Sequence, residues 1–320
     1  MRRLAVIGAL GVLVVLPATP AGGTFAGHNG RIVFERFGRD GPIQIASISK
    51  HGHDVRTLTD YKREAVAPDV SPNGGRIAFT LVGSRRVPDK LMTMRLGGAD
   101  AHAVTHGCTG DCLGDGDGAW SPDGRRLVFN RAFGPVVDGN ADHIDLMAVN
   151  RNGTHLRTLI PDTANQKRHL ETTDWTWSPD GTQLAATFVD LDNLDAAIYT
   201  VELDSHDMHR VTPWRLNAGN ADYSPDGRRI VFNSSYEGKA KEHASIYTIA
   251  PDGTALRRLT HPGVHYTAMP NFSPSGNQIV YAVFGRHTIT YLARRTIGGE
   301  THTRITPKTA RGIGPFWAAR

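Results

Sequence analysis

The stretch Trp120-Ser121-Pro122-Asp123-Gly124-Arg125-Arg126-Leu127-Val128-Phe129 decides the fold, because close copies of it recur along the chain. Proline sets φ for the first corner of a type I turn, and aspartate tolerates the second corner while bonding its own backbone. Glycine takes the left-handed position that reverses the chain. Because apolar or aromatic residues flank the turn on both sides, the stretch predicts a hairpin of two antiparallel strands.

The turn occurs five times at a regular period. The copies are Ser71-Pro72-Asn73-Gly74, Ser121-Pro122-Asp123-Gly124, Ser178-Pro179-Asp180-Gly181, Ser224-Pro225-Asp226-Gly227 and Ser273-Pro274-Ser275-Gly276. Counted at the apolar residue six places after each serine, the spacings are 50, 57, 46 and 49 residues. A single tetrapeptide of this kind would indicate only a turn, but five at this period are typical of propellers and solenoids.

Each period contains two further short strands. One runs into a glycine-containing turn, as Ile246–Ile249 does before Asp252-Gly253. The next ends in a Leu/Val-Thr signature, as in Arg257-Arg258-Leu259-Thr260. Four strands per period are what one propeller blade requires.

The two ends of the repeat region complete one another. The segment 29–34 looks like the second strand of a blade that lacks its first, and 314–318 looks like a first strand that lacks the rest. Trp317 occupies the aromatic position that Trp120 fills in its own repeat. We therefore predict an all-β, six-bladed β-propeller, closed by pairing of the C-terminal strand with the N-terminal blade, which protects two sheet edges at once.

The repeat pattern resembles that of a known family. Aromatic-Ser-Pro-Asp-Gly-x-x-Ile-x-Phe, followed by Ile-Tyr, Asp-Gly and Arg-Leu-Thr, is similar to the TolB-like six-bladed propeller, also called the WD40-like or PD40 repeat, over about residues 29–320. The resemblance implies the fold and leaves the function open. The periplasmic TolB protein also carries an α/β domain before its propeller, and nothing in this sequence matches that domain.

Residues 1–26 have the layout of a secretory signal peptide. Two arginines precede an apolar run from Leu4 to Leu16, and small residues follow through Ala21 and Ala26. The run is short for a membrane span, although a retained anchor is the alternative. Cleavage after Ala21 and cleavage after Ala26 both fit. We expect a secreted, periplasmic or envelope protein with a propeller at 27–320 and no membrane span after cleavage.

Composition agrees with an exported β protein. Glycine (35) and proline (18) are plentiful, as many tight turns require. Without Arg2 and Arg3 the net charge falls from +5 to about +3, since 34 basic residues then face 31 acidic ones. Because no basic block interleaved with aromatic residues is present, we expect no nucleic-acid partner, and we expect a monomer.

Strand order predicts where recognition takes place. The turns between first and second strands and between third and fourth strands are short and lie on one face. The other connections are long and unlike one another, so we expect them to bind a partner. Candidate ligand-binding residues at the channel rim on that face are Asp69, Asp117, Asp174, Asp222, Asn271, His143, His243 and His265.

Two interpretations of the rim acids remain open. Each acid either caps a backbone turn or bonds the next blade, or together they form an anionic funnel for a cation or an amine-bearing ligand. Because water at a channel mouth screens charge, we expect modest pKa shifts for these carboxyls. The histidines are either surface residues or ligands for a metal.

Cys108 and Cys112 are the two cysteines of the chain, and in an oxidising compartment they predict a local disulfide. A zinc site with His102 and His106 is the alternative. Asp111, Asp115 and Asp117, interleaved with glycines, resemble half of a calcium loop without its bidentate glutamate. We expect a flexible glycine-rich loop at this place and no cofactor, with a divalent cation such as calcium as the alternative.

Function is predicted from what the sequence contains and lacks. There is no Gly-x-Ser-x-Gly elbow, no His-Glu-x-x-His and no phosphate-binding glycine loop. We expect a binding module for a protein, peptide or glycan partner. The alternatives are a metal-dependent polysaccharide lyase or glycosidase built on the central channel, and a structural component of a surface layer.

Overall fold

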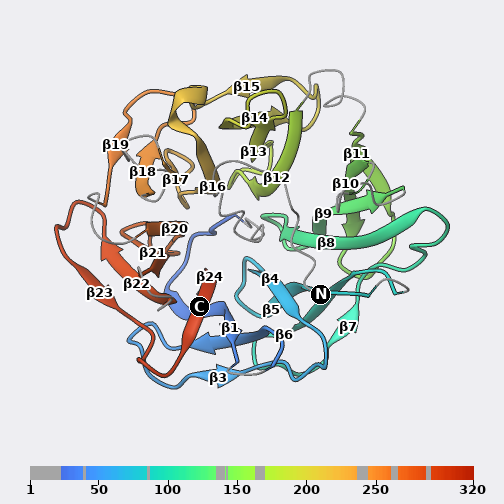
Figure 1. Cartoon of the computed structure of the whole chain (residues 1–320), viewed down its shortest axis with the longest axis horizontal. Coiled ribbons are helices and arrows are strands. Elements are labelled where there is room, and N and C mark those ends of the chain that lie inside the picture. The colour runs from blue at the N-terminus through green and yellow to red at the C-terminus, as the bar shows by residue number, and fades with distance from the viewer. Residues whose placement is uncertain are drawn as a thin grey trace.

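Six four-stranded antiparallel sheets form a ring in the computed structural model (Figure 1), and we call the space around the ring's axis, between the inner strands, the central channel. The structure describes residues 23–38, 41–84, 87–134, 141, 143–162, 170–235, 244–260, 266–285 and 290–320. His243, His265 and residues 1–22 of the predicted signal peptide lie outside these ranges. The prediction of a six-bladed propeller is confirmed.

The blades follow one another around the ring in chain order, and the strands of each blade run in order from the channel outwards. Blade 1 comprises β24 (Arg311–Ala319), β1 (Asn29–Phe37), β2 (Gln44–Ile48) and β3 (Arg56–Thr57). Blade 2 comprises β4 (Ala65–Val70), β5 (Arg76–Leu81), β6 (Lys90–Arg95) and β7 (His102–Ala103). Blade 3 comprises β8 (Cys112–Trp120), β9 (Arg126–Phe133), β10 (His143–Asn150) and β11 (Arg157–Ile160).

The remaining three blades have the same order of strands. Blade 4 comprises β12 (Leu170–Trp177), β13 (Gln183–Asp190), β14 (Ala196–Glu202) and β15 (Met208–Arg210). Blade 5 comprises β16 (Ala218–Tyr223), β17 (Ile230–Ser234), β18 (Ser245–Ile249) and β19 (Arg257–Arg258), and is preceded by the 3-10 turn η1 (Trp214–Leu216). Blade 6 comprises β20 (Tyr266–Phe272), β21 (Gln278–Phe284), β22 (Thr290–Thr296) and β23 (His302–Arg304).

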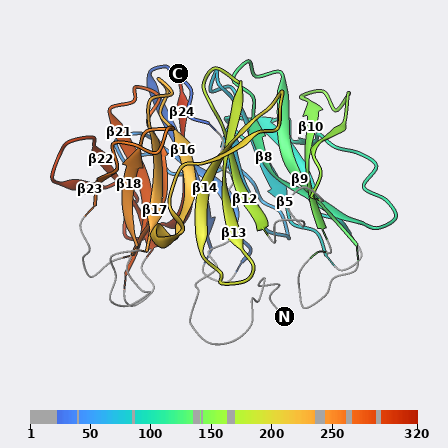
Figure 2. The same cartoon turned by 90° about the horizontal axis from the view of Figure 1, so that it is seen from above.

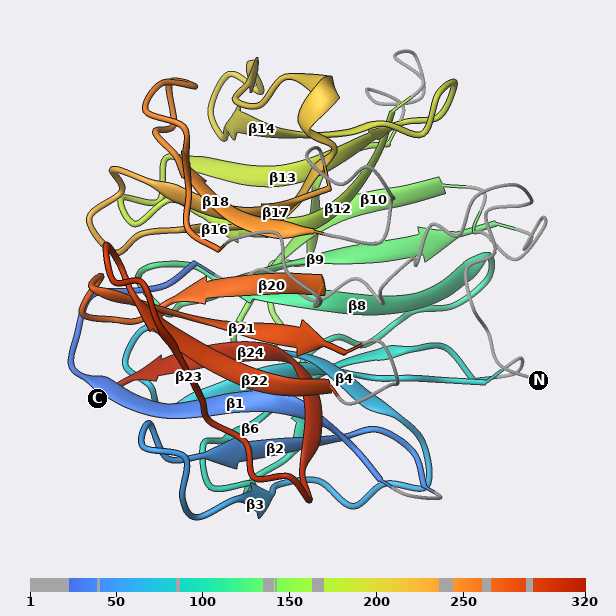
Figure 3. The same cartoon turned by 60° about the vertical axis from the view of Figure 1, so that its left-hand side comes forward.

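The ring closes as the sequence predicts. β24 pairs antiparallel with β1 and brings Trp317 opposite Ile32, so β1 lies between β24 and β2 (Figure 3). The indole Nε1–H of Trp317 donates to the carbonyl of Gly30 at 3.3 Å. The C-terminal strand therefore supplies the innermost edge of a blade whose other strands begin the propeller.

The repeated hairpin turn is stabilised by its own serine and aspartate. In the second copy, the Ser121 hydroxyl donates to Asp123 and accepts the N–H of Arg126 at 3.0 Å. Gly124 has a φ of +63°, and a Cβ there would lie 3.6 Å from Pro72 in the preceding blade's turn. The turns thus pack against one another around one face of the ring.

The threonine of the Leu/Val-Thr signature has a specific role. The hydroxyls of Thr212 and Thr260 accept the backbone N–H of Ile198 and Ile246, each at 2.8 Å. Both threonines are buried. The side chain thereby satisfies a donor on the third strand at the point where the short fourth strand has ended.

The core lies between neighbouring blades rather than in one centre. Trp120, Trp177, Trp317, Tyr223 and Phe272 fill equivalent inner-strand positions, and each is at most 2% exposed. One apolar cluster joins Ala78 and Leu91 of blade 2 to Trp120 and Leu127 of blade 3. Within the described residues, no helix has the length and apolar character that crossing a membrane requires.

One local expectation is wrong. Residues 112–120 form the inner strand β8 and not a flexible loop. Glycine is required there because β8 runs close to blade 2: a Cβ at Gly114 would lie 2.6 Å from the backbone nitrogen of Asp89. The glycines therefore permit close blade packing.

Candidate functional site

The two ends of the central channel differ. Because strands alternate in direction, the Ser-Pro-Asp-Gly turns share one face, which we call the turn face, with the C-terminus (Figure 2). The opposite face, which we call the loop face, carries the connections from second to third strands and from each blade to the next. The turn face is therefore built from similar short turns, and the loop face from connections that differ between blades.

The chain's own N-terminal segment, residues 23–28, closes the turn-face end. Thr24 is 1% exposed: its N–H donates to Asp222 Oδ1 at 3.1 Å and its hydroxyl donates to Oδ2 at 2.8 Å. Phe25 is buried in the same apolar cluster as Trp120. The segment appears in Figure 1 as the blue trace that leads from the centre of the ring to β1.

The packed segment includes residues 23–26, which the sequence pattern assigns to the signal peptide. The N–H of Gly27 donates to the carbonyl of Pro274 at 3.1 Å, and a Cβ at Gly23 would lie 2.5 Å from the carbonyl oxygen of Trp177. Residues 23–26 are therefore packed against the propeller, and the boundary at residue 27 stays a prediction. Cleavage of a leader stays a prediction.

The five predicted rim residues belong to two different sets. Each inner strand reaches the turn face at an aromatic or apolar residue, which we call its end residue. These are Val70, Trp120, Trp177, Tyr223, Phe272 and Trp317. Three residues before the end residue, each strand has a β-bulge whose backbone is left-handed, with φ between 54° and 59°. The bulge residues are Ala67, Asp117, Asp174, Asn220, Met269 and Gly314. Asp69, Asp222 and Asn271 instead lie two residues nearer the turn face. The five candidate residues therefore do not share one position in their strands.

Asp69, Asp222 and Asn271 join neighbouring blades. Each accepts the backbone N–H of the end residue of the next inner strand. The bonds run from Trp120 to Asp69 (2.6 Å), from Phe272 to Asp222 (2.7 Å) and from Trp317 to Asn271 (2.9 Å). Of the two interpretations, the geometry of Asp69, Asp222 and Asn271 supports the one in which each residue bonds the next blade.

The expected modest pKa shifts are also wrong. Burial raises the pKa of Asp222 to about 8 and that of Asp69 well above its usual range, against the lowering effect of the N–H donors. These carboxyls are buried between blades, where water does not screen them as it would at a channel mouth.

The remaining two acids gather with a third that the sequence pattern did not single out. Asp117 and Asp174 occupy adjacent bulges, and Glu35 on β1 accepts the N–H of the Ala67 bulge at 2.8 Å. We call Glu35, Asp117 and Asp174 the acid cluster. The sequence does contain a pattern that could have identified Glu35. In five blades, a polar residue directly follows the buried apolar residue at the middle of the second strand. These polar residues are Glu35, Thr80, Asn130, Thr187 and Asn233.

The electrostatics of the acid cluster follow from burial. Burial raises the pKa of Glu35 to about 8, of Asp174 to about 7 and of Asp117 to about 6. The negative charge of Asp117 adds to the increase at both Glu35 and Asp174. Among the described residues, no lysine, arginine or histidine forms an ion pair with any of the three.

Some acceptor oxygens of the acid cluster are hydrogen-bonded and others are not. Asp174 Oδ2 accepts from Asn220 at 3.0 Å, and Asp117 Oδ2 accepts from Asn130 at 3.4 Å. At the acid cluster, three buried oxygens have no hydrogen-bond partner among the described residues: Glu35 Oε2, Asn130 Oδ1 and Asp174 Oδ1. Buried acceptors are normally paired, so this wall suits a ligand that brings its own donors.

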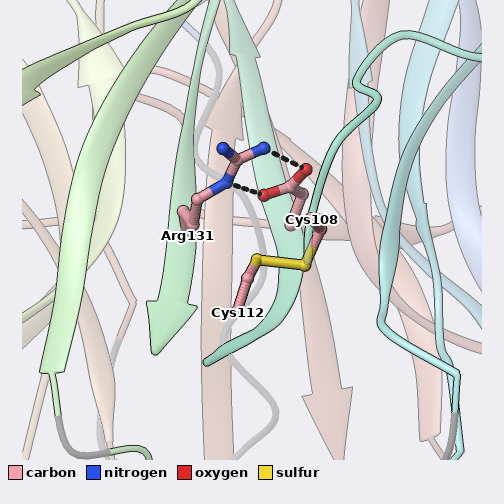
Figure 4. Close-up of a disulfide and its surroundings, with 4 residues drawn as sticks. Cys108, Cys112 and Arg131 are labelled. Atoms are coloured by element: carbon pink, nitrogen blue, oxygen red, sulfur yellow. Dashed lines mark hydrogen bonds and ion pairs between the residues drawn. A yellow bond between two sulfur atoms is a disulfide. The ribbon is translucent and has the colours of Figure 1, made fainter. Parts of the chain in front are cut away.

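The two cysteines form a disulfide beside a buried ion pair (Figure 4). Arg131 contacts both carboxylate oxygens of Asp115, at 2.6 and 2.9 Å, on the adjoining strands. In the part of the chain described, His, Cys, Asp and Glu ligand atoms gather in threes within 4.8 Å at one place, Cys108, Cys112 and Asp115. Because the sulfurs are bonded to each other and Arg131 neutralises Asp115, this group does not suit zinc or calcium.

His143 lies away from the acid cluster, at the start of the third strand of blade 3. Its ring stacks on Phe133 with centroids 4.9 Å apart and an interplanar angle of 11°. The pair stands on the loop face, where the second strand ends and the third begins. It is part of a half-buried surface rather than of the channel wall.

Comparison with known proteins places the chain among propellers. Residues 155–319, more than half of the chain, match the PD40 family, described as the TolB beta propeller domain. An uncharacterized protein of Agrobacterium fabrum (strain C58) is 32% identical over 195 residues. That alignment covers 52% of this chain and 64% of the relative, somewhat less than two thirds of its length.

Solved structures agree in fold. TolB from Acinetobacter baumannii superposes with a TM-score of 0.72 at 16% identity, over 91% of this chain and 67% of that one. A putative TolB from Agrobacterium tumefaciens gives 0.65 at 21% identity, over 90% and 92%. An oligogalacturonate lyase in complex with manganese gives 0.58 at 17% identity, over 90% and 77%. At these identities the likeness concerns the fold alone.

Proposed function

Because this chain belongs to the TolB β-propeller family, we propose that it is a secreted or periplasmic binding module that holds a protein, peptide or glycan partner on its loop face. The family relation supports binding in general. The chain's own residues indicate which face the partner uses.

The observation that carries the proposal is the closed turn-face end of the channel. Thr24 and Phe25 are buried there, and the hydrogen bonds from Thr24 to Asp222 hold the segment in place. A partner that uses the channel must therefore approach from the loop face. The bulge residues, including Asp117 and Asp174, lie nearer to that face than the residues that the segment contacts.

Half-buried aromatic rings on the loop face support the same choice. They stand at ends of second strands or before inner strands, at Phe37, Tyr61, Phe133, Trp214, Tyr266 and Phe284. Tyr266 and Phe284 pack edge to face with centroids 5.4 Å apart. Aromatic side chains that keep one side accessible are enriched in binding interfaces.

A matched pair of exposed leucines tests the choice of face. Leu191 lies in the β13–β14 connection on the loop face and is 47% exposed, and Leu256 precedes β19 on the turn face and is 45% exposed. With a photo-crosslinking residue at either position in the producing cell, we expect discrete partner adducts from position 191 and none from 256. Adducts from 256 alone would contradict the proposal.

A second function is favoured by one observation. Carboxyls whose pKa values lie near neutrality, as at Asp117 and Asp174, suit general acid–base catalysis. We propose a lyase or glycosidase activity as the alternative. Incubation with uronic-acid polymers and neutral glycans tests it, and activity that Asp174→Asn abolishes would favour the enzyme over the binding module.

A further inference from the structure

The unpartnered acceptors of the acid cluster specify the chemistry of a ligand. Glu35 is fully buried and Asp174 is 5% exposed, yet each keeps one carboxylate oxygen without a hydrogen bond. Asn130 adds a third unpartnered oxygen beside Asp117, to which its amide donates. Leaving buried acceptors unpaired costs free energy, so a filled site has donors directed at them.

We propose that the acid cluster binds a guanidinium group, presented as an arginine side chain by the protein partner that occupies the loop face. This inference rests on the binding function proposed above and names the chemistry that the partner brings. A guanidinium carries five N–H donors, accepts none and stays charged. It thus supplies donors for the three unpartnered oxygens, and a positive charge for acids that form no ion pair among the described residues.

The spacing of the acids favours guanidinium over a compact metal ion. Glu35 belongs to blade 1, Asp117 to blade 3 and Asp174 to blade 4, and their ligand atoms do not form a group of three within 4.8 Å. A metal ion needs several oxygens at about 2.0–2.6 Å. A planar group with donors along three edges reaches acceptors that are further apart, and it is more weakly hydrated than an ammonium ion.

Within the acid cluster, Glu35 also joins two blades, because it accepts the N–H of Ala67, whereas Asp174 accepts no backbone N–H from the described residues. Asp69 and Asp222 bind backbone N–H groups of the next blade, whereas the described contacts of Asp174 are made with two side chains, Asn220 and Thr173. At the sixth bulge the chain uses Gly314 without any carboxylate. The ring therefore closes without an acid at the bulge.

The test uses small probes on the complete exported protein. Ethylguanidinium is the probe, N-ethylurea is its neutral isostere, and calcium chloride is the metal alternative. Binding is measured from the NMR chemical shifts of the Asp and Glu carboxyl carbons. We expect ethylguanidinium to shift the Glu35 and Asp174 carboxyl signals and N-ethylurea to leave them unchanged.

Variants locate the site. Asp174→Asn and Glu35→Gln should each weaken ethylguanidinium binding by about tenfold or more, the usual loss for a charge-assisted hydrogen bond. Asp252→Asn, in an exposed turn on the other face, is the matched control and should bind as the wild type does. Two variants keep the test decisive if one of them folds poorly.

Each other outcome overturns the proposal. Equal binding by N-ethylurea, wild-type affinity in both acid variants, or carboxyl shifts with calcium and none with ethylguanidinium would refute a guanidinium site. The crosslinks from position 191 are then repeated in the Glu35→Gln/Asp174→Asn double variant. Their persistence would show that the loop-face partner binds without this cluster, so the two proposals fail separately.

Discussion

At the scale of single residues, equivalent-looking acids have opposite roles. Asp222 accepts three hydrogen bonds, from the Thr24 N–H and hydroxyl and from the Phe272 N–H. Asp174 accepts from side chains and keeps one oxygen unpaired. A difference of two positions relative to the end of the inner strand separates a residue that accepts a backbone N–H of the next blade from one whose described hydrogen bonds come only from side chains.

Alanine substitutions should separate these roles. Asp222→Ala leaves the N–H groups of Thr24 and Phe272 without an acceptor, so we expect a loss of about 2–4 kcal/mol in the free energy of unfolding. Asp174→Ala removes a buried acid with a raised pKa, and we expect a change within about 1 kcal/mol. Chemical denaturation measures both. Equal losses would mean that Asp174 is also structural.

The signature threonine gives a second residue-scale prediction. Thr212→Val keeps the shape but removes the acceptor of the Ile198 N–H, so we expect a loss of about 1–3 kcal/mol. Thr303→Val, at an exposed position of β23, is the control and should change stability little. Urea titration measures the free energy of unfolding of the two variants. Equal losses in Thr212→Val and Thr303→Val would contradict the role assigned to the Thr212 hydroxyl.

At the scale of elements, the segment 23–28 acts as part of the propeller although it has no strand of its own. It satisfies Asp222, adds Phe25 to an apolar cluster and contacts the turn of blade 6 through Pro274. The six inner strands leave a channel, and this segment fills one end of it. A leader, if it is removed, must be cleaved before this segment for the packing to be kept.

Truncation tests the role of the segment. A chain that begins at Gly27 loses Thr24 and Phe25, leaves Asp222 buried with fewer partners, and should lose about 2–5 kcal/mol relative to one that begins at Gly22. Thermal unfolding of the two chains measures this. N-terminal sequencing of the exported protein should find Thr24 present, and a mature terminus at Gly27 would contradict the assignment.

At the scale of the whole molecule, stability is distributed around a ring. Each of the six apolar clusters joins residues of two adjacent blades. Buried acids without counter-ions reduce stability when they ionise. The ring remains folded despite this cost because the apolar clusters between its blades stabilise it.

Glu35 is one of the buried acids that make the stability depend on pH. Its pKa is about 8 in the folded protein against a usual 4.5, raised by burial and by the charges of Asp117 and Glu64. Between these values the folded state holds more protons than the unfolded state, so stability falls as pH rises. Glu35→Gln removes this effect while keeping an acceptor for the Ala67 N–H.

The difference in the free energy of unfolding between the wild type and Glu35→Gln therefore reports the contribution of the Glu35 carboxyl. We expect the variant's advantage to grow by an amount on the order of 2–4 kcal/mol from about pH 5 to pH 8, and to level off above that. Urea titrations at several pH values measure it. A difference that is constant with pH would mean that Glu35 is ionised in both states.

The sequence by itself determined the hairpins, the blades and the closure. The Ser-Pro-Asp-Gly turns, the aromatic residue before them and the strand missing at each end are local signals, because turn chemistry and side-chain alternation act over a few residues. The disulfide between Cys108 and Cys112 is local in the same way.

Only the tertiary structure decided which polar groups meet in the channel. Glu35, Asp117 and Asp174 come from three blades, and their approach depends on the bulge in each inner strand and on the angle at which the ring closes. The insertion of Thr24 beside Asp222, 198 residues away, likewise depends on the finished ring. Spacing along the chain identifies polar positions in each repeat but not which of them meet, because those contacts are set by how separate sheets pack.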